Sequence, residues 1–354
     1  MQERVAVAMS GGVDSSVAAL LLQNAGYDLV GVTMTLFPGG DSPSDDGQDA
    51  RRVAHALGFA HHVFDLSQTF RTQVMDRFVC AYEQGETPNP CIDCNRHLKF
   101  GALLQRAREL SCSKVATGHY VRLEQDPGSG RWLLRKALHP EKDQSYVLYC
   151  LSQQQLACSL FPLGGLSKQE IRAIAREHDL VSAAKRDSQD ICFIPDGDYS
   201  AFLRRYTGAD YPPGDFLDEQ GQVLGTHTGI VDYTIGQRRG LGVSSNHGRL
   251  YVKQVCPASN TVVLSENEAL FARSLTACRP NFLPFDRLDA PLHLRAKIRY
   301  RMAEQPCTVE QTDADTLRVT FDQPQRAITP GQAVVFYDGD VVVGGATIQK
   351  GETV

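Results

Sequence analysis

The chain has 354 residues and a net charge of -5, with 42% hydrophobic and 22% charged residues. These values are ordinary for a soluble globular protein of two or three domains, and the negative net charge excludes a general attraction to nucleic acid. Any RNA binding must therefore come from a local basic face. The sequence shows no signal peptide and no membrane-spanning run, which predicts a cytoplasmic protein without a membrane partner, whose ten cysteines are mostly buried thiols.

The first motif is SGGVDSS, residues 10–16, between a predicted strand at 5–9 and a predicted helix at 15–25. Its two glycines lack the Cβ atoms that would keep a ligand away from the backbone, so the amides at the helix start can bind an anion. No lysine precedes the serines, which disfavours a Walker-type NTPase. Asp14 stands there instead. An acid beside phosphate predicts an Mg²⁺ ion between the two.

The following segments alternate between strands and helices, which predicts a parallel sheet with ligands at the carboxyl ends of its strands. Met34 lies near the end of one predicted strand, and Gly118 and His119 lie at the end of another. In chain order we expect a strand at 29–36, a polar loop at 38–47, a helix at 49–57, a strand at 61–66, a helix at 69–82 and a strand at 113–120.

A second motif is GETPNPCIDCNRHLKF, residues 85–100. The prolines on either side of Asn89 predict an extended loop, followed by a helix from about residue 95 to 110. Cys91 and Cys94 would then stand just before a helix N-terminus, which lowers the pKa of a thiol. This isolated CxxC pair is compatible with redox chemistry, metal binding or no special role, whereas a closed structural zinc site is disfavoured.

Cys192 lies in the segment 183–199. Its local context favours a buried structural cysteine, because nearby acids oppose the charge of nearby bases. Before it, the sequence predicts a hairpin with its turn at 126–130, and the motif KDQSYVLY occupies residues 142–149.

From about Tyr211 the short strands and Gly or Pro turns predict β-rich domains, with 329–337 and 341–348 as the closing strands of a small barrel. Residues 292–302 alternate between basic and apolar side chains. On a single strand this alternation gives a basic face without an acid, which favours phosphate contact. The basic residues are Arg295, Lys297, Arg299 and Arg301.

SGGVDSS resembles the pyrophosphate loop of the N-type ATP pyrophosphatase superfamily. Together with NPCIDCNRHLKF, TGHY, KDQSY, RDSQDICFIP, YTIGQRRGLGV and KIRYR in this order, nearly the whole chain resembles the bacterial tRNA-specific 2-thiouridylases. The resemblance implies an α/β fold with a parallel-sheet ATP pyrophosphatase domain, a small central β domain and a C-terminal β-barrel. We place these domains at residues 1–205, 206–272 and 273–354.

The resemblance implies ATP-dependent 2-thiolation of the wobble uridine of tRNA. ATP adenylates the carbon-2 oxygen of uracil, and a cysteine persulfide then supplies sulfur, giving 2-thiouridine, AMP and pyrophosphate. The implied cofactors are ATP and Mg²⁺, with no tightly bound prosthetic group. The implied partners are tRNA and a sulfur-relay or cysteine-desulfurase protein that donates a persulfide.

The family's site residues carry over position by position. Cys192 would carry the persulfide and Cys94 would be its partner nucleophile, which reverses the structural interpretation of Cys192. Some relatives have an aspartate where Cys91 stands, so a carboxylate role there is absent or displaced. The implied ATP site comprises Met9, Ser10, Gly11, Gly12, Val13, Asp14, Ser15, Ser16, Met34 and Gly118, with Asp14 as the Mg²⁺ ligand. The implied target-base loop is Asn89, Pro90 and Cys91, and the implied tRNA contacts are His119, Lys142, Asp143, Gln144, Arg299, Tyr300 and Gln332.

Three alternatives remain at this point. The chain could be an iron–sulfur tRNA thiolase of the same superfamily that uses Cys91, Cys94 and Cys192 as cluster ligands. It could be an amide-forming or arginine-pathway ligase with the same ATP loop, although such a ligase has no use for paired cysteines. It could also be a tRNA-binding protein without catalytic activity.

Overall fold

The computed structural model describes residues 2–37, 47–180, 191–243 and 248–352. Its N-terminal part is built on a sheet of order β3-β2-β1-β4-β7 in which each neighbouring pair is parallel. Val5, Ala6 and Val7 are fully buried at its centre, as their apolar run predicts. The strands are β1 Arg4–Ala8, β2 Asp28–Thr35, β3 Ala60–Asp65, β4 Lys114–Ala116 and β7 Ser159–Leu160. The predicted parallel sheet is confirmed, although β4 is shorter than expected.

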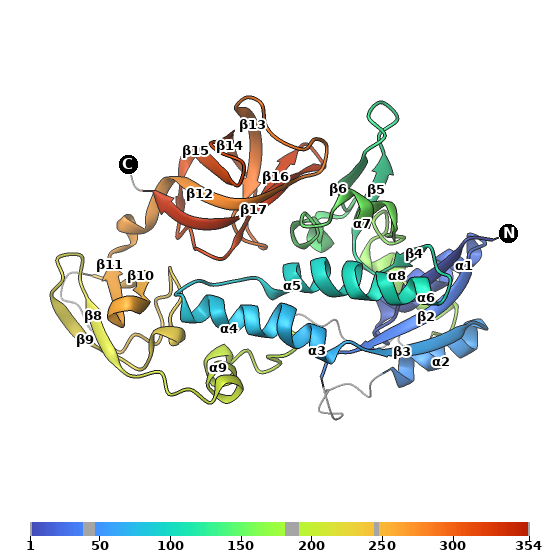
Figure 1. Ribbon diagram of the computed structural model, residues 1–354, viewed down its shortest axis with the longest axis horizontal. Coiled ribbons are helices and arrows are strands. Elements are labelled where there is room, and N and C mark those ends of the chain that lie inside the picture. Colours follow the sequence, from blue (N-terminus) through green and yellow to red (C-terminus); the bar gives the residue numbers. More distant parts are fainter. Residues whose placement is uncertain (1, 38–46, 181–190, 244–247, 353–354) are drawn as a thin grey trace.

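Helices cover this sheet, and two long helical runs extend from it side by side (Figure 1). The first run joins α3 Ser67–Phe70, η2 Arg71–Met75 and α4 Asp76–Glu83, and the second joins α5 Pro90–Asp93, η3 Cys94–Ala102 and α6 Leu103–Glu109. The remaining longer helices are α1 Val13–Asn24, α2 Gln48–Leu57, α7 Gln153–Ala157, α8 Lys168–Glu177 and α9 Tyr199–Thr207. The predicted loop at 38–47 falls mostly outside the described residues.

The second run begins at Pro90, so the prediction of an extended loop up to residue 95 is wrong. Asn89 caps this helix, because its Oδ1 accepts a hydrogen bond of 3.1 Å from the Cys91 amide. Proline is favoured at the first helical position, where a missing N–H costs nothing. Cys91 and Cys94 therefore lie inside the first turns of the helix.

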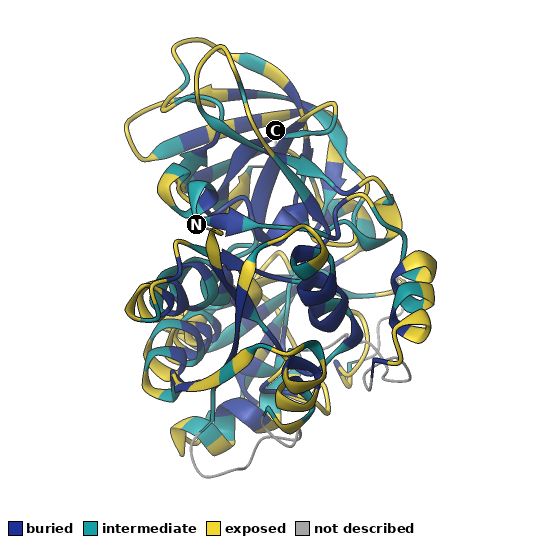
Figure 2. Cartoon of the chain, turned by 90° about the vertical axis from the view of Figure 1, so that its right-hand side faces the viewer, coloured by how far each residue is buried: buried dark blue, intermediate teal, exposed yellow. Residues whose placement is uncertain are grey.

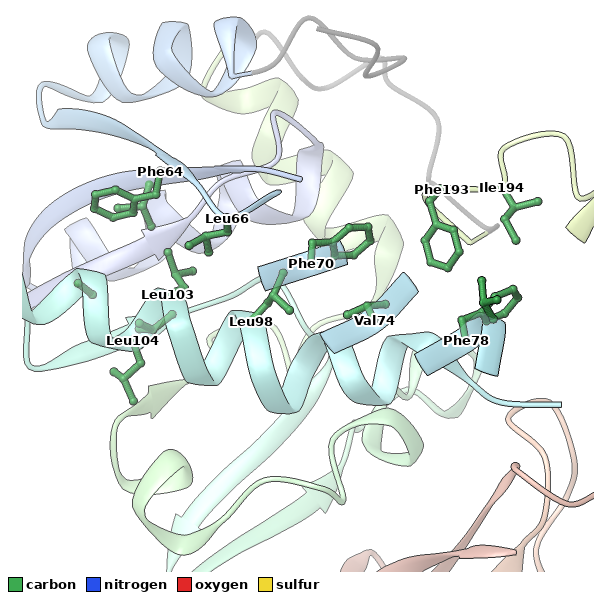
Figure 3. Close-up of a cluster of buried hydrophobic side chains, with 14 of the residues drawn as sticks. Phe64, Leu66, Phe70, Val74, Phe78, Leu98, Leu103, Leu104, Phe193 and Ile194 are labelled. Carbon is green, nitrogen blue, oxygen red and sulfur yellow. The ribbon is translucent and has the colours of Figure 1, made fainter. Parts of the chain in front are cut away.

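Apolar side chains of both helical runs belong to one buried cluster, among them Phe70, Val74 and Leu98 (Figure 3). Phe193 packs against Phe70, Phe78 and Phe202, with ring centroids 5.7, 5.3 and 5.0 Å apart. Ile194 is also buried. Since burial of a large apolar side chain stabilises by about 1.5–3 kcal/mol, this pair fixes the chain immediately after Cys192.

The middle of the chain forms a four-stranded sheet of order β10-β11-β8-β9. Phe216, Val252, Val262 and Leu264 make its small core. Its strands are β8 Gly214–Leu217, β9 Val223–His227, β10 Tyr251–Cys256 and β11 Thr261–Ser265. The predicted β-rich texture is confirmed here.

The C-terminal strands close into a six-stranded barrel, because β12 pairs with both β15 and β17. The strands are β12 Phe271–Phe282, β13 Leu292–Lys297, β14 Gln305–Gln311, β15 Thr316–Arg326, β16 Ala333–Asp338 and β17 Val341–Glu352. Figure 2 shows dark blue, buried residues along the strands of the barrel and of the parallel sheet. Short helical turns lie between elements: η4 Pro140–Lys142, η5 Ser145–Val147, η6 Ile230–Asp232, η7 Pro257–Ser259 and η8 Asn267–Leu270.

The barrel is joined to the N-terminal part by the predicted hairpin, β5 Val121–Gln125 and β6 Trp132–Lys136. Val341 of β17 pairs with Arg135 of β6, so the hairpin continues the barrel sheet. The Asp340 carboxylate forms ion pairs with Arg122 at 2.6 Å and with Arg135 at 2.5 Å. The N-terminal hairpin and the barrel therefore form one hydrogen-bonded surface.

The predicted basic strand over 292–302 is wrong in its second half. β13 ends at Lys297, after which the chain turns. Glu304 faces the strand and lies 3.8 Å from Arg295 Nε, so the face also carries an acid. The prediction failed because Glu304 lies beyond the alternating stretch in the sequence, and the turn after β13 brings it back beside Arg295.

Candidate functional site

The nucleotide loop leaves β1 and enters α1 through two glycines. Gly11 has a positive φ of 71°, a conformation that glycine adopts without strain. Ser15 Oγ accepts the Ser10 amide at 3.3 Å and donates to the Gly12 carbonyl at 3.1 Å. The side chains thus tie the loop to itself, while the α1 N-terminus provides amide donors for an anion.

Gly118 packs directly against this loop. A Cβ atom at Gly118 would lie 3.0 Å from the carbonyl carbon of Asp14 and 3.0 Å from the Ser15 nitrogen. Any larger residue would push the loop away. The structure therefore brings Gly118 together with Asp14 and Ser15, two other predicted ATP-site residues.

Lys168 supplies the cation that the loop sequence lacks. Its Nζ donates to both carboxylate oxygens of Asp14, at 2.7 and 2.9 Å, and the Tyr120 hydroxyl donates to Asp14 Oδ1 at 2.6 Å. The sequence interpretation missed Lys168. A signal was available, since Ser167 and Glu170 form a capping box and a lysine at the positive end of a helix is electrostatically unfavourable without an anionic partner.

Met9 and Met34 lie at the carboxyl ends of β1 and β2, beside the nucleotide loop. The Thr33 hydroxyl donates to the Met9 carbonyl at 2.7 Å and lies 2.9 Å from His61 Nε2. Burial, with the nearby Arg51, lowers the pKa of His61. A neutral His61 therefore stays as the partner of Thr33 and holds the two strand ends in register.

The CxxC thiols do not have the lowered pKa that the sequence predicts. Burial raises the pKa of both Cys91 and Cys94, and the Lys99 ammonium only partly opposes this effect. The expectation was wrong because the helix begins four residues earlier than residue 94, so Cys94 is not at the positive helix end. For both thiols, the effect of burial also outweighs that of Lys99, although Cys91 keeps solvent contact.

Cys192 belongs to the same site as the CxxC pair. Burial and then the thiols of Cys94 and Cys91 raise its pKa to about 12, while Lys99 opposes the rise. Cys192 keeps solvent contact, so it is not sealed in a core. Cys91, Cys94 and Cys192 together form a cysteine cluster. Residues 183–190 of its predicted segment lie outside the described residues.

His119 links the nucleotide loop to the cysteines. It follows Gly118, its Nδ1 lies 2.7 Å from the Thr117 hydroxyl, and its Nε2 lies 3.4 Å from Lys99 Nζ. Burial and Lys99 hold the His119 pKa well below its usual value. The site therefore contains a neutral imidazole beside Lys99, which acts on all three thiols.

Several predicted tRNA-contacting residues form bonds within the protein. Asp143 Oδ2 accepts from Ser145 Oγ at 2.7 Å, and Gln144 Oε1 accepts from the Tyr120 amide at 2.9 Å. Gln332 Nε2 donates to the Thr87 carbonyl at 2.6 Å. Lys142 ends the turn η4 beside them. Their contact with tRNA stays a prediction.

Tyr300 and Arg299 differ in where they point. The Tyr300 side chain is 39% exposed, its hydroxyl donates to the Asp143 carbonyl at 3.3 Å, and burial, Asp143 and Cys91 raise its pKa. Tyr300 thus brings the barrel close to Cys91. Arg299 instead turns inward, where its Nη2 donates to Thr329 Oγ1 at 2.7 Å and to the carbonyls of Ala327 and Ile235.

The fold and the site together define a class: a HUP-type nucleotide domain whose phosphate loop is connected to the cysteine cluster through Gly118 and His119, followed by two β domains. Three family models match, described as tRNA methyl transferase HUP domain over residues 3–196, tRNA methyl transferase PRC-barrel domain over 200–266 and aminomethyltransferase beta-barrel domain over 272–348.

Full-length relatives define the family more narrowly. The chain is 45% identical to the tRNA-specific 2-thiouridylase MnmA of Clostridioides difficile and 47% identical to MnmA 1 of Caldanaerobacter subterraneus subsp. tengcongensis, with 99% of each chain covered. It is 47% identical to MnmA of Desulforamulus reducens, covering 99% of this chain and 98% of the relative. The protein belongs to the tRNA-specific 2-thiouridylase family.

No helix among the described residues is long and apolar enough to cross a membrane. Within the same residues, no group of three or more His, Cys, Asp or Glu side chains is arranged to hold a metal ion.

Proposed function

We propose that this protein converts the wobble uridine of tRNA to 2-thiouridine in an adenylation step and a sulfur-transfer step. The observation that carries the proposal is that Gly118 and His119, which are adjacent in the chain, connect the nucleotide loop to the cysteines. Gly118 packs on the nucleotide loop and His119 contacts Lys99, which acts on the three thiols. An activated base bound at this link would be within reach of both ATP and sulfur.

The first step activates a poor leaving group. The carbon-2 oxygen of uracil attacks the α-phosphorus of ATP, and pyrophosphate leaves. The α1 N-terminus and Lys168 stabilise the negative charge of the phosphates, since both are positive and fixed before ATP binds.

Asp14 would hold Mg²⁺ together with the phosphates of ATP, and the bound ion would neutralise charge on the leaving pyrophosphate. The residues fit such an ion, because Mg²⁺ in nucleotide sites is commonly bound through one or two carboxylates plus substrate phosphates. Asp14 offers one carboxylate at the mouth of the loop, and that carboxylate is oriented by Lys168 and Tyr120.

The second step transfers sulfur. The terminal sulfur of a Cys192 persulfide attacks carbon 2, and AMP leaves with the former carbon-2 oxygen. The Cys94 thiolate then attacks Cys192 Sγ, which breaks the bond to the transferred sulfur, forms a Cys94–Cys192 disulfide and releases 2-thiouridine. A dithiol reductant restores both thiols, and a sulfur-donor protein reloads Cys192. Such cycling, in a chain whose ten cysteines are free thiols, is suited to the reducing cytoplasm.

The experiment is nucleoside mass spectrometry of unmodified tRNA after incubation with ATP, Mg²⁺ and a persulfide donor. We expect 2-thiouridine with the natural protein and none with Cys94→Ser or Cys192→Ser. Cys256→Ser is the matched control, because Cys256 is half-buried in the central sheet and should retain activity. Full activity of either site variant would contradict the two-cysteine mechanism.

The same samples separate the iron–sulfur alternative. If anaerobically purified protein is brown, contains stoichiometric iron and loses activity with that iron, then the thiols bind a cluster and the persulfide mechanism is wrong. If protein without iron forms 2-thiouridine and AMP, the persulfide mechanism stands. Formation of AMP only in the presence of tRNA would exclude both the ligase and the non-catalytic alternatives.

A further inference from the structure

A cavity of about 250 Å³ lies behind the target-base loop, on the side facing the barrel. Its walls come from α4, from the loop residues Pro88 and Asn89, from the start of the second helical run, and from β12, β16 and β17 of the barrel. None of the residues assigned above to ATP or to sulfur transfer lines it. The cavity exists only because the barrel is docked on the helices.

Three arginines from three different elements line this cavity: Arg77 from α4, Arg96 from the second helical run and Arg279 from β12. A guanidinium presents a planar fork of donors that matches phosphate oxygens. Among the described residues, neither Arg96 nor Arg279 has a carboxylate within ion-pair distance, and the Arg279 side chain donates only to the neutral Thr347 hydroxyl, at 3.2 Å. Two of the three cations thus lack a bonded anion.

Two carboxylates also line the cavity, and neither forms an ion pair with Arg96 or Arg279 among the described residues, although Asp93 attracts Arg96 from a longer distance. Asp93 Oδ1 pairs with Arg77 at 3.3 Å and lies 3.9 Å from His97. Burial raises the pKa of Glu86, with Arg279 opposing, so the site disfavours the charged form of Glu86. Cys80 and Gln84 hydrogen bond to each other on the α4 wall. The remaining charge balance is positive.

Arg279 is held in an unfavourable backbone conformation. Its φ is 55°, a value that residues other than glycine seldom adopt. It lies where the pairing of β12 with β17 shifts register, between Cys278 and Asn281, and its amide donates to the Asp315 carbonyl at 3.1 Å. Bulges of this kind re-aim a side chain, and backbone strain is concentrated at functional sites. This bulge directs Arg279 into the cavity.

We infer that this arginine cavity is a binding site for a phosphate group, which the arrangement of the loop suggests is a phosphodiester of the substrate RNA next to the target base. The inference rests on the proposed function only for the source of the phosphate. Asn89 both lines the cavity and caps the helix that carries Cys91. A nucleotide anchored here would position its neighbour at the cysteine cluster.

The test compares Arg279→Gln and Arg77→Gln with Arg287→Gln, an arginine of the same barrel whose side chain is 76% exposed and pairs with Asp289. Binding of an unmodified tRNA and of its isolated anticodon stem-loop is measured without ATP over a range of salt concentrations. Losing one phosphate contact should reduce the slope of log affinity against log salt by about 0.7–0.9. We expect this change for Arg279→Gln and Arg77→Gln on both RNAs, and none for Arg287→Gln.

Calorimetry with inorganic phosphate gives the second arm. Phosphate binding that Arg279→Gln abolishes, with an unchanged RNA slope, would support the site and assign it to a free phosphate. Unchanged RNA slopes together with unchanged phosphate binding in folded Arg279→Gln and Arg77→Gln would overturn the inference. That failure is separate from failure of the proposed function, which is judged by whether the natural protein forms 2-thiouridine. Arg77 lies on an exposed helix face, so its variant keeps the test valid if Arg279→Gln does not fold.

Discussion

At the scale of single residues, Lys168 changes how the nucleotide loop is understood. It is contributed by α8 and bonds both oxygens of Asp14. We predict that Lys168→Met lowers the rate of tRNA-dependent AMP formation by roughly a hundred-fold to a thousand-fold, the usual cost of removing one stabilising donor of transition-state charge. Lys114→Met, at the far end of the sheet in a pair with Glu3, should leave the rate unchanged. Equal rates for both variants would show that Lys168 does not contribute to AMP formation, either directly or by orienting Asp14.

The pKa of Cys192 gives a prediction about pH. Burial and the neighbouring thiols raise the pKa of Cys192 to about 12. The reactive thiolate is therefore scarce at neutral pH, and its fraction keeps increasing about tenfold per pH unit even beyond pH 9. We expect the rate of Cys192 alkylation by iodoacetamide, followed by peptide mass spectrometry, to keep rising to pH 10. Lys99→Gln should lower the rate further, since it removes a cation that favours the thiolate. A plateau near pH 8 to 9 would contradict the pKa shift.

At the scale of elements, the N-cap of α5 connects sequence to site geometry. Asn89→Ala removes the side-chain oxygen that accepts the Cys91 amide, which should cost about 1 kcal/mol of stability. Asn89→Asp keeps a capping oxygen and is the matched control. Thermal unfolding should show a melting temperature lower by about 2–4 °C for the alanine variant alone. An equal loss in both variants would mean that the amide of Asn89, and not its capping oxygen, supports the loop.

The elements also show what could be predicted from the sequence. The strands around the nucleotide loop were predictable because each is a local run of apolar residues between glycine turns, and β1 and β2 follow those runs. The start of α5 was not predictable, since proline is favoured both in loops and at the first position of a helix. The end of β13 was also missed, because alternation continued in the sequence beyond the point where the chain turned.

The site residues can also be divided into those that the sequence predicts and those that it misses. The loop glycines and Gly118 were predictable from a contiguous motif and a strand end, and the structure places Gly118 against Asp14 and Ser15 of the same loop. Lys168 and Glu304 were missed because their roles depend on contacts between segments distant in sequence. The thiol pKa direction was wrong for a related reason: burial is a property of the whole fold, and it outweighs the local effect of a helix end.

At the scale of the whole molecule, Arg299 joins the central domain to the barrel. Its half-buried guanidinium donates to the Ile235 carbonyl of the former and to Ala327 and Thr329 of the latter. We predict that Arg299→Ala destabilises the protein by about 1–3 kcal/mol, because buried carbonyls lose their donor. The exposed neighbour Arg301 is the control, and Arg301→Ala should be neutral in thermal unfolding. A reduced salt slope for tRNA binding by Arg299→Ala at unchanged stability would show that Arg299 contacts phosphate instead.

The most direct measurement of the central claim follows the oxygen that leaves the base. A tRNA whose target uridine carries a heavy oxygen isotope at carbon 2 is incubated with the protein, ATP, Mg²⁺ and a persulfide donor, and the products are analysed by mass spectrometry. Adenylation of the carbon-2 oxygen at the Ser10–Ser16 loop predicts that the heavy oxygen appears in AMP in equal amount to the 2-thiouridine formed. Recovery of the heavy oxygen in water or pyrophosphate, with unlabelled AMP, would contradict the account.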